Sequence, residues 1–290
     1  MGTKMRELPA ALAIAALLLA AAGLAESASA GTLDKIRQDG TIRLAYRDDA
    51  PPFSAKGEGG EPTGYSVELC RAVAASIKGQ LGLANLAVAY VPVTAADRFD
   101  AIESNRADLL CEATTATLSR RKHVDFSIPT FLSGASLLIQ AGGPTSFKDL
   151  DGKKIGVLGG TTTEQALVNS LKEEGMTAEV VIVKTHPEGL QLLEQGKIVG
   201  YFADRTILQF LTRDKEAAAK LMLADNYLTI EPYALAIPRG DEDFRLAVDT
   251  ALSTIYRSGE IGQIFARSFG KETKASDLVK ALYIIAGLPE

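Results

Sequence analysis

The stretch that decides the fold is Lys153-Lys-Ile-Gly-Val-Leu-Gly-Gly-Thr-Thr-Thr-Glu-Gln-Ala-Leu167, in the middle of the chain. It begins with a short apolar run, Lys154–Leu158, of the kind that forms a buried strand. Two glycines then make a turn, and Thr161 to Glu164 fit a capping box, in which Thr161 is the helix N-cap and Glu164 reaches back to it. A strand, a glycine turn and a helix in direct succession indicate the α/β class.

Strand-like and helix-like patterns alternate through the rest of the chain as well. The predicted strands are 41–46, 87–93, 107–111, 180–183 and 199–203, and the predicted helices are 65–77, 96–104 and 188–195, the last with Pro187 at its start. The stretch Lys56–Gly64 is rich in glycine and reads as a hairpin loop. The alternation predicts mainly parallel sheets with helices on their faces.

Two extended stretches, Ala135–Gln140 and Thr229–Ile237, flank the middle of the chain. If both cross between two halves of the molecule, the segment between them is an inserted lobe. We therefore expect a discontinuous lobe 1 formed by residues 31–138 and 232–290, and a lobe 2 formed by residues 139–231.

The N-terminus has the three parts of a secretory signal peptide. Lys4 and Arg6 are positive, residues 10–25 are apolar, and Ala28-Ser-Ala30 is a small-residue cleavage site. We expect cleavage after Ala30 and a mature protein that diffuses in the periplasm without inserting into the membrane. A retained anchor is the alternative, because the apolar run approaches the ~20 residues that span a bilayer.

Composition and motifs exclude several classes of function. The net charge of −5 and the lack of a basic block argue against nucleic acid and anionic lipid surfaces as partners. The motifs of serine hydrolases, zinc proteases and P-loop enzymes are missing from the sequence. His123 and His186 lack metal-ligand spacing, so we expect neither a metal nor a cofactor. Gly156–Gly160 misses the spacing of a nucleotide-binding turn, but amides at the following helix start can receive a carboxylate.

The only two cysteines are Cys70, on a helical pattern, and Cys111, at the end of a predicted strand. In an oxidising compartment an even count favours one disulfide. Two buried free thiols are the alternative, because spacing alone fixes no geometry.

A cluster of hydroxyl and basic residues follows the predicted strand at 107–111. The stretch runs Asp108-Leu-Leu-Cys-Glu-Ala-Thr-Thr-Ala-Thr-Leu-Ser-Arg-Arg-Lys-His-Val-Asp-Phe-Ser127. Thr115 and Arg120 in it could grip one carboxylate, since a guanidinium offers a planar pair of donors. An ordinary helix start with surface charges is the alternative.

The chain resembles the periplasmic amino-acid-binding proteins of ABC transporters (bacterial solute-binding protein family 3), and within them the glutamate/aspartate-binding branch. The likeness covers nearly all of the mature chain and rests on the order and spacing of many short motifs. They are Thr32-Leu-Asp-Lys-Ile36, Arg47-x-x-x-x-Pro52-Phe-Ser54, Gly64-Tyr-Ser66, Cys111 to Ser127, Gly160-Thr-Thr162 with Glu164, Leu192-Leu-Glu-x-Gly196, Asp204, Glu231-x-Tyr233 and Ser258-Gly-Glu260.

The resemblance implies a type II periplasmic binding protein fold, with two lobes, two crossover strands as a hinge, and the ligand in the cleft between the lobes. It also implies that the protein is a monomer, which closes on an amino acid and delivers it to the permease of an ABC importer in the inner membrane. Closure follows from charge, because a zwitterion taken out of water needs both of its charges paired.

The resemblance further assigns roles at the ligand's two α-groups. Arg120 and Thr115 would bind the α-carboxylate, helped by amides near Thr161 and Thr162. Asp204 would accept the α-ammonium, together with the carbonyl of Ala113, whose position holds a serine in the acidic-ligand branch. The other implied pocket residues are Arg47, Arg98 and His186 around a side-chain carboxylate, Phe53 as an apolar wall, and Tyr233.

Three further departures, besides Ala113, bear on specificity. Ala95 also stands where the acidic-ligand branch has a serine, Glu112 replaces a glycine, and Arg205 replaces an aspartate. Glutamate or aspartate is the leading expectation, with a neutral or larger amino acid as the alternative. A second function is also open, because some cyclohexadienyl (prephenate/arogenate) dehydratases share this fold, and Glu112 could then be a general acid.

Overall fold

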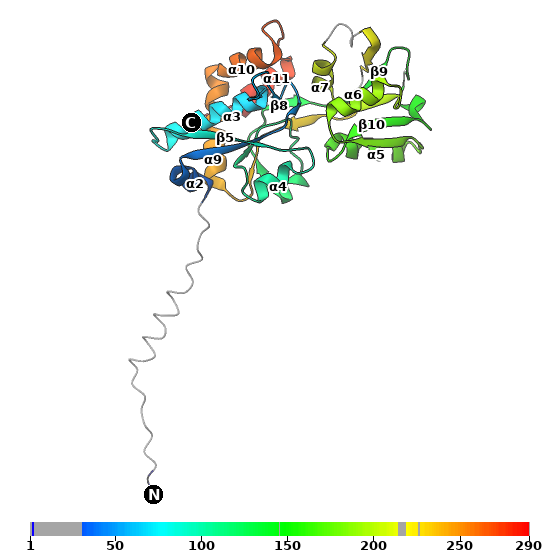
Figure 1. The fold of residues 1–290 in the computed structure, drawn as a ribbon. Helices are drawn as coiled ribbons and strands as arrows, with labels where there is room; N and C mark the ends of the chain where they lie inside the picture. Colours follow the sequence, from blue (N-terminus) through cyan, green and yellow to red (C-terminus); the bar gives the residue numbers. More distant parts are fainter. Residues whose placement is uncertain (1, 3–30, 145, 214–218, 226, 290) are drawn as a thin grey trace.

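The computed structural model describes residues 2, 31–144, 146–213, 219–225 and 227–289. The predicted signal peptide, residues 1–30, therefore lies outside the described residues except for Gly2. Figure 1 shows two lobes side by side, each with its own sheet and helices. Among the described residues, we find no helix with the length and apolar character needed to cross a membrane.

Lobe 1 is built on a five-stranded sheet in the order β5-β1-β6-β15-β7. Its strands are β1 (Thr41–Tyr46), β5 (Ala87–Pro92), β6 (Leu109–Leu110), β7 (Val124–Phe126) and β15 (Ala236–Pro238). The strand β1 runs parallel to β5 and β6, whereas β15 is antiparallel to β6 and β7. Its helices are α2 (Thr32–Asp39), α3 (Tyr65–Gln80), α4 (Arg98–Glu103), α9 (Glu242–Ser258), α10 (Glu260–Phe269) and α11 (Asp277–Ala286).

A small antiparallel sheet and a short 3-10 turn complete lobe 1. The small sheet consists of β2 (Asp49–Ala50), β3 (Ser54–Lys56) and β4 (Pro62–Thr63), and the 3-10 turn is Arg120–Lys122. Because β3 and β4 pair antiparallel on either side of the glycine-rich loop, the predicted hairpin at Lys56–Gly64 is confirmed.

Lobe 2 is also built on a five-stranded sheet, in the order β11-β10-β12-β9-β13. Its strands are β9 (Ala135–Gln140), β10 (Lys154–Leu158), β11 (Glu179–Val183), β12 (Gly200–Asp204) and β13 (Leu221–Leu223). Its helical segments are a 3-10 turn (Phe147–Leu150), α5 (Thr162–Glu173), α6 (His186–Glu194) and α7 (Arg205–Leu211). The strand β10 runs parallel to β11 and β12, as the alternation of patterns predicts.

The two lobes are joined by β8 (Phe131–Ser133) and β14 (Glu231–Tyr233), which pair with each other antiparallel. The prediction that Ala135–Gln140 is a crossover is wrong, because this stretch is β9 and pairs with β12 and β13. The expected boundary between residues 138 and 139 consequently falls inside a strand of lobe 2. An apolar extended stretch reads the same in a hinge and in a sheet, so the pattern alone misplaced the boundary.

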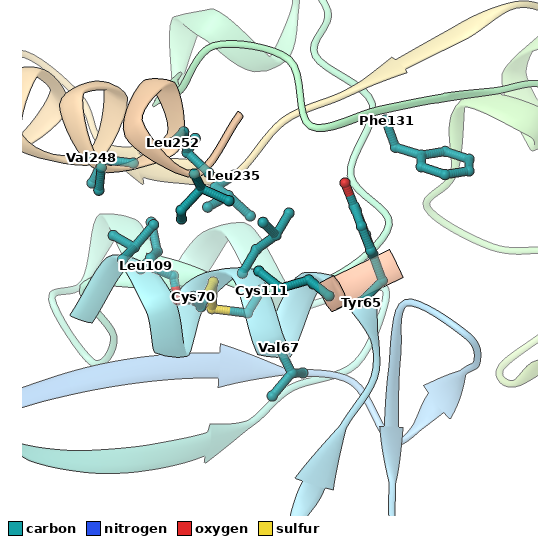
Figure 2. Close-up of a cluster of buried hydrophobic side chains, with 14 of the residues drawn as sticks. Tyr65, Val67, Cys70, Leu109, Cys111, Phe131, Leu235, Val248 and Leu252 are labelled. Atoms are coloured by element: carbon teal, nitrogen blue, oxygen red, sulfur yellow. Dashed lines mark hydrogen bonds between the residues drawn. A yellow bond between two sulfur atoms is a disulfide. The ribbon is translucent and has the colours of Figure 1, made fainter. Parts of the chain in front are cut away.

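The predicted disulfide is present and belongs to the core of lobe 1. Cys70 on α3 is bonded to Cys111, directly after β6, with their Cα atoms 6.1 Å apart. Both cysteines are fully buried in an apolar cluster that includes Leu109 and Leu235, as Figure 2 shows. The bridge ties the end of β6 to α3, just before the loop that carries Glu112.

Candidate ligand-binding site

The predicted site residues gather between the lobes because most of them follow the carboxyl ends of strands. In lobe 1, Arg47 follows β1, Arg98 follows β5, and the loop from Glu112 to Thr115 follows β6. In lobe 2, the corresponding residues follow β10, β11 and β12; they are Thr161, Thr162, His186 and Asp204. In α/β sheets, this is the edge at which ligands bind.

The cleft between the lobes is closed in this structure. The backbone N–H of His186 donates to Asp49 Oδ2 at 3.1 Å, and Arg98 Nη2 donates to the carbonyl of Gly160 at 3.0 Å. The hydroxyls of Thr115 and Thr162 are 3.3 Å apart. Each of these contacts joins lobe 1 to lobe 2, so the polar groups of the two lobes face each other directly.

Arg120 lies partly buried at the start of its 3-10 turn, with its guanidinium 5.1 Å from the centre of the Phe99 ring. Among the described residues its guanidinium donates one hydrogen bond, from Nη1 to the carbonyl of Thr115 at 2.9 Å. Burial lowers the pKa of Arg120, while the nearby carboxylates of Glu112 and Glu231 act in the opposite direction. A buried guanidinium bonded to a single carbonyl retains donors for a carboxylate.

Glu231 is a central residue of the site to which the sequence analysis assigned no role. It begins the crossover strand β14, is buried, and accepts from the hydroxyls of Thr115, Thr162 and Thr229, the last two at 2.5 and 2.8 Å. Thr115, expected to bind the ligand's carboxylate, and Thr162, near the amides expected to help it, therefore bond through their hydroxyls to a carboxylate of the chain. A charged residue inside an extended apolar stretch was the available signal, since a buried carboxylate must be paired.

Asp204, at the end of β12, is placed to accept a cation. Its Oδ1 is buried and has no hydrogen-bond partner among the described residues, and the same holds for the hydroxyl of Tyr233. Burial raises the pKa of Asp204 to about 7, with a further contribution from the negative charge of Glu231, whereas the nearby hydroxyl of Tyr233, a potential donor to the carboxylate, acts to lower it. A buried carboxylate oxygen without a donor is satisfied by an ammonium group.

Arg47 and Arg98 are paired within the chain. Arg47 lies 2.7 Å from Asp49 Oδ1 and 3.3 Å from Glu112 Oε2, and Arg98 Nε lies 3.3 Å from Glu112 Oε1. All but Asp49 are almost completely buried. Burial is the main cause that lowers the pKa of Arg98 to about 10, and Glu112 opposes it. Arg47 keeps a raised pKa because Glu112 and Asp49 outweigh the effect of burial.

His186 is buried at the start of α6, where its Nδ1 lies 2.8 Å from the hydroxyl of Tyr201. Burial, and next the positive charge of Arg47, lower the pKa of His186 to about 3. The imidazole is therefore neutral and contributes a hydrogen bond but no charge at neutral pH.

The other expected site residues have mostly structural contacts. Thr161 caps α5 by accepting from the N–H of Glu164 at 3.1 Å, as predicted. Glu164, however, accepts from the N–H of Gly160 and not from that of Thr161. Phe53 is fully buried, with its ring centre 5.1 Å from that of Tyr233. Ala113 is partly exposed beside the cleft.

The described residues hold no group of three or more side chains suited to a metal ion. Two hollows lie away from the cleft. One of about 1220 Å³ lies against α2 and α9, and one of about 440 Å³ lies against β9 and β13 in lobe 2.

Two α/β lobes, a paired hinge and opposed cationic and anionic groups in the cleft define a protein that closes on a small charged ligand. The chain belongs to the bacterial extracellular solute-binding proteins, family 3, whose sequence pattern matches residues 42–271. The expected family and the expected two-lobed fold are thereby confirmed.

Relatives cover nearly the whole chain. An L-glutamate/L-aspartate-binding protein of Pseudomonas aeruginosa is 34% identical over 269 residues, which make up 91% of this chain and 89% of the relative. A glutamate/aspartate import solute-binding protein of Escherichia coli is 30% identical over 295 residues, or 94% and 95% of the two chains.

A solved structure of an ancestral amino acid-binding protein, described as a precursor of cyclohexadienyl dehydratase, matches with a TM-score of 0.71 at 27% identity. The match covers 83% of this chain and 100% of that one. The named relatives are binding proteins of transport, which supports a binding protein and not an enzyme.

Proposed function

We propose that the protein binds a small L-amino acid between its lobes and delivers it to the permease of an ABC importer. The observation that carries the proposal is the pair of available groups on opposite lobes. Arg120 of lobe 1 has donors to spare, and Asp204 of lobe 2 has a buried oxygen without a donor. An α-carboxylate and an α-ammonium would pair these groups together, and only when the cleft is closed.

The amides at the start of α5 add to this arrangement. Thr162 is the first residue of α5 and lies across the cleft from Thr115. The N-terminus of a helix favours an anion, so it supports the binding of the α-carboxylate by Arg120. The ligand would be held by side chains from one lobe and by a helix end from the other.

The names of the relatives favour a glutamate- or aspartate-binding component of an importer, in agreement with the sequence. Residues 1–30 would be removed during export, and the mature chain would act as a monomer in the periplasm. The permease would recognise the closed form of the protein, since closure brings the two lobes into one fixed arrangement.

The dehydratase alternative is less well supported. Glu112 would have to give up a proton as a general acid, but its two oxygens face Arg47 and Arg98. A carboxyl group between two guanidinium groups is placed as an ion-pair partner. No turnover of prephenate or arogenate is therefore expected from the purified protein.

The decisive experiment is calorimetry of the refolded, ligand-stripped protein against all standard amino acids and small dicarboxylates. We expect at least one amino acid to bind, and the same compound without its α-ammonium group to bind far more weakly. The proposal fails if no compound in the panel binds, or if deaminated analogues bind equally well.

A further inference from the structure

The half of the cleft around Arg47 and Arg98 would face a ligand's side chain, and it differs from the half that would hold the ligand's α-carboxylate and α-ammonium. Arg47 is bonded to Asp49 through Nε at 2.9 Å and approaches Glu112 through Nη1 at 3.3 Å. Arg98 approaches Glu112 through Nε at 3.3 Å, and its two terminal nitrogens donate to the carbonyls of Ala95 and Gly160. Each guanidinium nitrogen thus lies beside an oxygen of the chain, but Arg47 Nη2 and Arg98 Nε make no hydrogen bond within the described residues, so charge pairing is the main interaction that these groups share with Asp49 and Glu112.

The charges of this half sum to zero. Arg47 and Arg98 carry two positive charges, and Asp49 and Glu112 carry two negative charges. His186, which lies beside them with its backbone N–H on Asp49, is neutral because burial lowers its pKa to about 3. A carboxylate added to this half would be a buried negative charge, and the described residues of this half offer no unpaired cation to it.

Glu112 is the residue responsible for this balance. Its side chain is completely buried, with one oxygen toward each arginine, and Thr114 donates to it as well. Without the Glu112 carboxylate, the half would carry a net positive charge, and two guanidinium groups would face an empty position. That position is where a carboxylate at the end of a ligand's side chain would pair with both of them.

We infer that Glu112 is a specificity-determining residue that takes the place of an acidic ligand side chain, so that this protein, unlike the relatives named for glutamate and aspartate, selects amino acids with uncharged side chains. The inference rests on the proposed function, because it needs the α-groups to be held at Arg120 and Asp204. The uncharged amides glutamine and asparagine match the acids in shape and add no charge to the balanced half. Unlike the carboxylate, an amide can both donate and accept among the groups present.

The test compares each acid with its amide, because the two differ in charge and hardly in shape. We expect the ligand-stripped wild-type protein to bind glutamine or asparagine at least about 10-fold more tightly than the corresponding acid, since an unpaired buried charge is strongly disfavoured. Glu112→Gln removes the charge at constant shape and is expected to move the acid-to-amide ratio of affinities by at least about 10-fold toward the acid. Glu174→Gln, at an exposed position of lobe 2, is the matched control and should leave the ratio unchanged.

Several results would overturn the inference. A preference of the wild-type protein for glutamate or aspartate over the amides would overturn it. This result needs no variant, so it counts even if Glu112→Gln fails to fold. A preference for lysine or arginine, or a folded Glu112→Gln variant with the wild-type ratio, would overturn it as well. If no amino acid binds at all, the proposed function fails together with this inference, whereas preference for an acid rejects the inference alone.

Discussion

Asp204→Asn is expected to stabilise the unliganded protein above neutral pH while abolishing ligand binding. The carboxyl group of Asp204 has its pKa raised from 3.8 to about 7, first by burial and then by Glu231. The folded state thus holds this proton more tightly than the unfolded state does. The stability that the protonated group confers is present below about pH 4 and is lost as the pH rises through about 7.

The magnitude follows from the size of the rise. One pKa unit is worth about 1.36 kcal/mol, so a rise from 3.8 to about 7 corresponds to at most about 4 kcal/mol of unfolding free energy. Asp204 is partly exposed as a residue, although its Oδ1 is buried, so solvent screening reduces this figure toward about 2–3 kcal/mol. Asparagine has no ionisable group, so the variant does not lose this free energy of unfolding as the pH rises.

The pH dependence of the free energy of unfolding is measured by urea denaturation of ligand-stripped protein. The measurements cover a series of pH values from about 4 to about 8. The free energy of unfolding of wild type relative to Asp204→Asn should fall by about 2–3 kcal/mol over that range. Asp48→Asn, at an exposed loop position, is the control and should show no such trend. A difference between wild type and Asp204→Asn that stays constant with pH would refute the reasoning.

Binding should show the opposite dependence, since an ammonium group needs the ionised form of Asp204. Below about pH 7 the ligand must displace a proton, and its affinity should fall roughly tenfold for each pH unit. Affinity that is independent of pH between about 5 and 8 would contradict the assignment of Asp204 to the α-ammonium group.

Three further predictions concern single contacts. Arg120→Lys should weaken amino-acid binding by about 2–5 kcal/mol in calorimetry, because an ammonium cannot replace a planar pair of donors, whereas Arg121→Lys on the exposed side should bind normally. Replacing Cys70 and Cys111 by serine opens a bridge with a sequence separation of 41 residues and should lower the free energy of unfolding by about 4 kcal/mol in urea; an unchanged midpoint would show that the disulfide contributes nothing. Gly189→Ala would place a Cβ atom 2.2 Å from Cε2 of the Tyr201 ring in β12 and should cost about 1–3 kcal/mol, so a variant with wild-type thermal stability would contradict this close packing.

The sequence predicted the elements of the fold well because both helix and strand leave a periodic pattern. The strands at 41–46 and 154–158 have the predicted bounds, and the disulfide is formed. The crossover was misplaced because β9 and a hinge strand share the same apolar, extended character. Only the pairing of β9 with β12 distinguishes them, and pairing depends on residues far away in the chain.

The sequence predicted which residues form the candidate site, but it did not predict the contacts that these residues make with one another. Arg47, Arg98 and His186 do lie together, but the sequence could not show that Asp49 and Glu112 already pair with the arginines. Those pairs join residues that are distant along the chain, so no local pattern records them. The pKa of His186 is likewise set by burial, which appears only after folding. The roles of all these residues in ligand binding stay predictions.

The order of strands in the two sheets also fixes the order in which the lobes can be completed. All five strands of lobe 2 come from one continuous run, from β9 to β13. Lobe 1 needs β15 between β6 and β7, and β15 follows the whole of lobe 2 in the chain. A chain that emerges with its N-terminus first therefore finishes its second lobe before its first. Until then β6 keeps an unpaired edge and β7 lacks its partner in the sheet. Synthesis that stops after residue 228 would leave a complete lobe 2 sheet attached to an open, association-prone lobe 1.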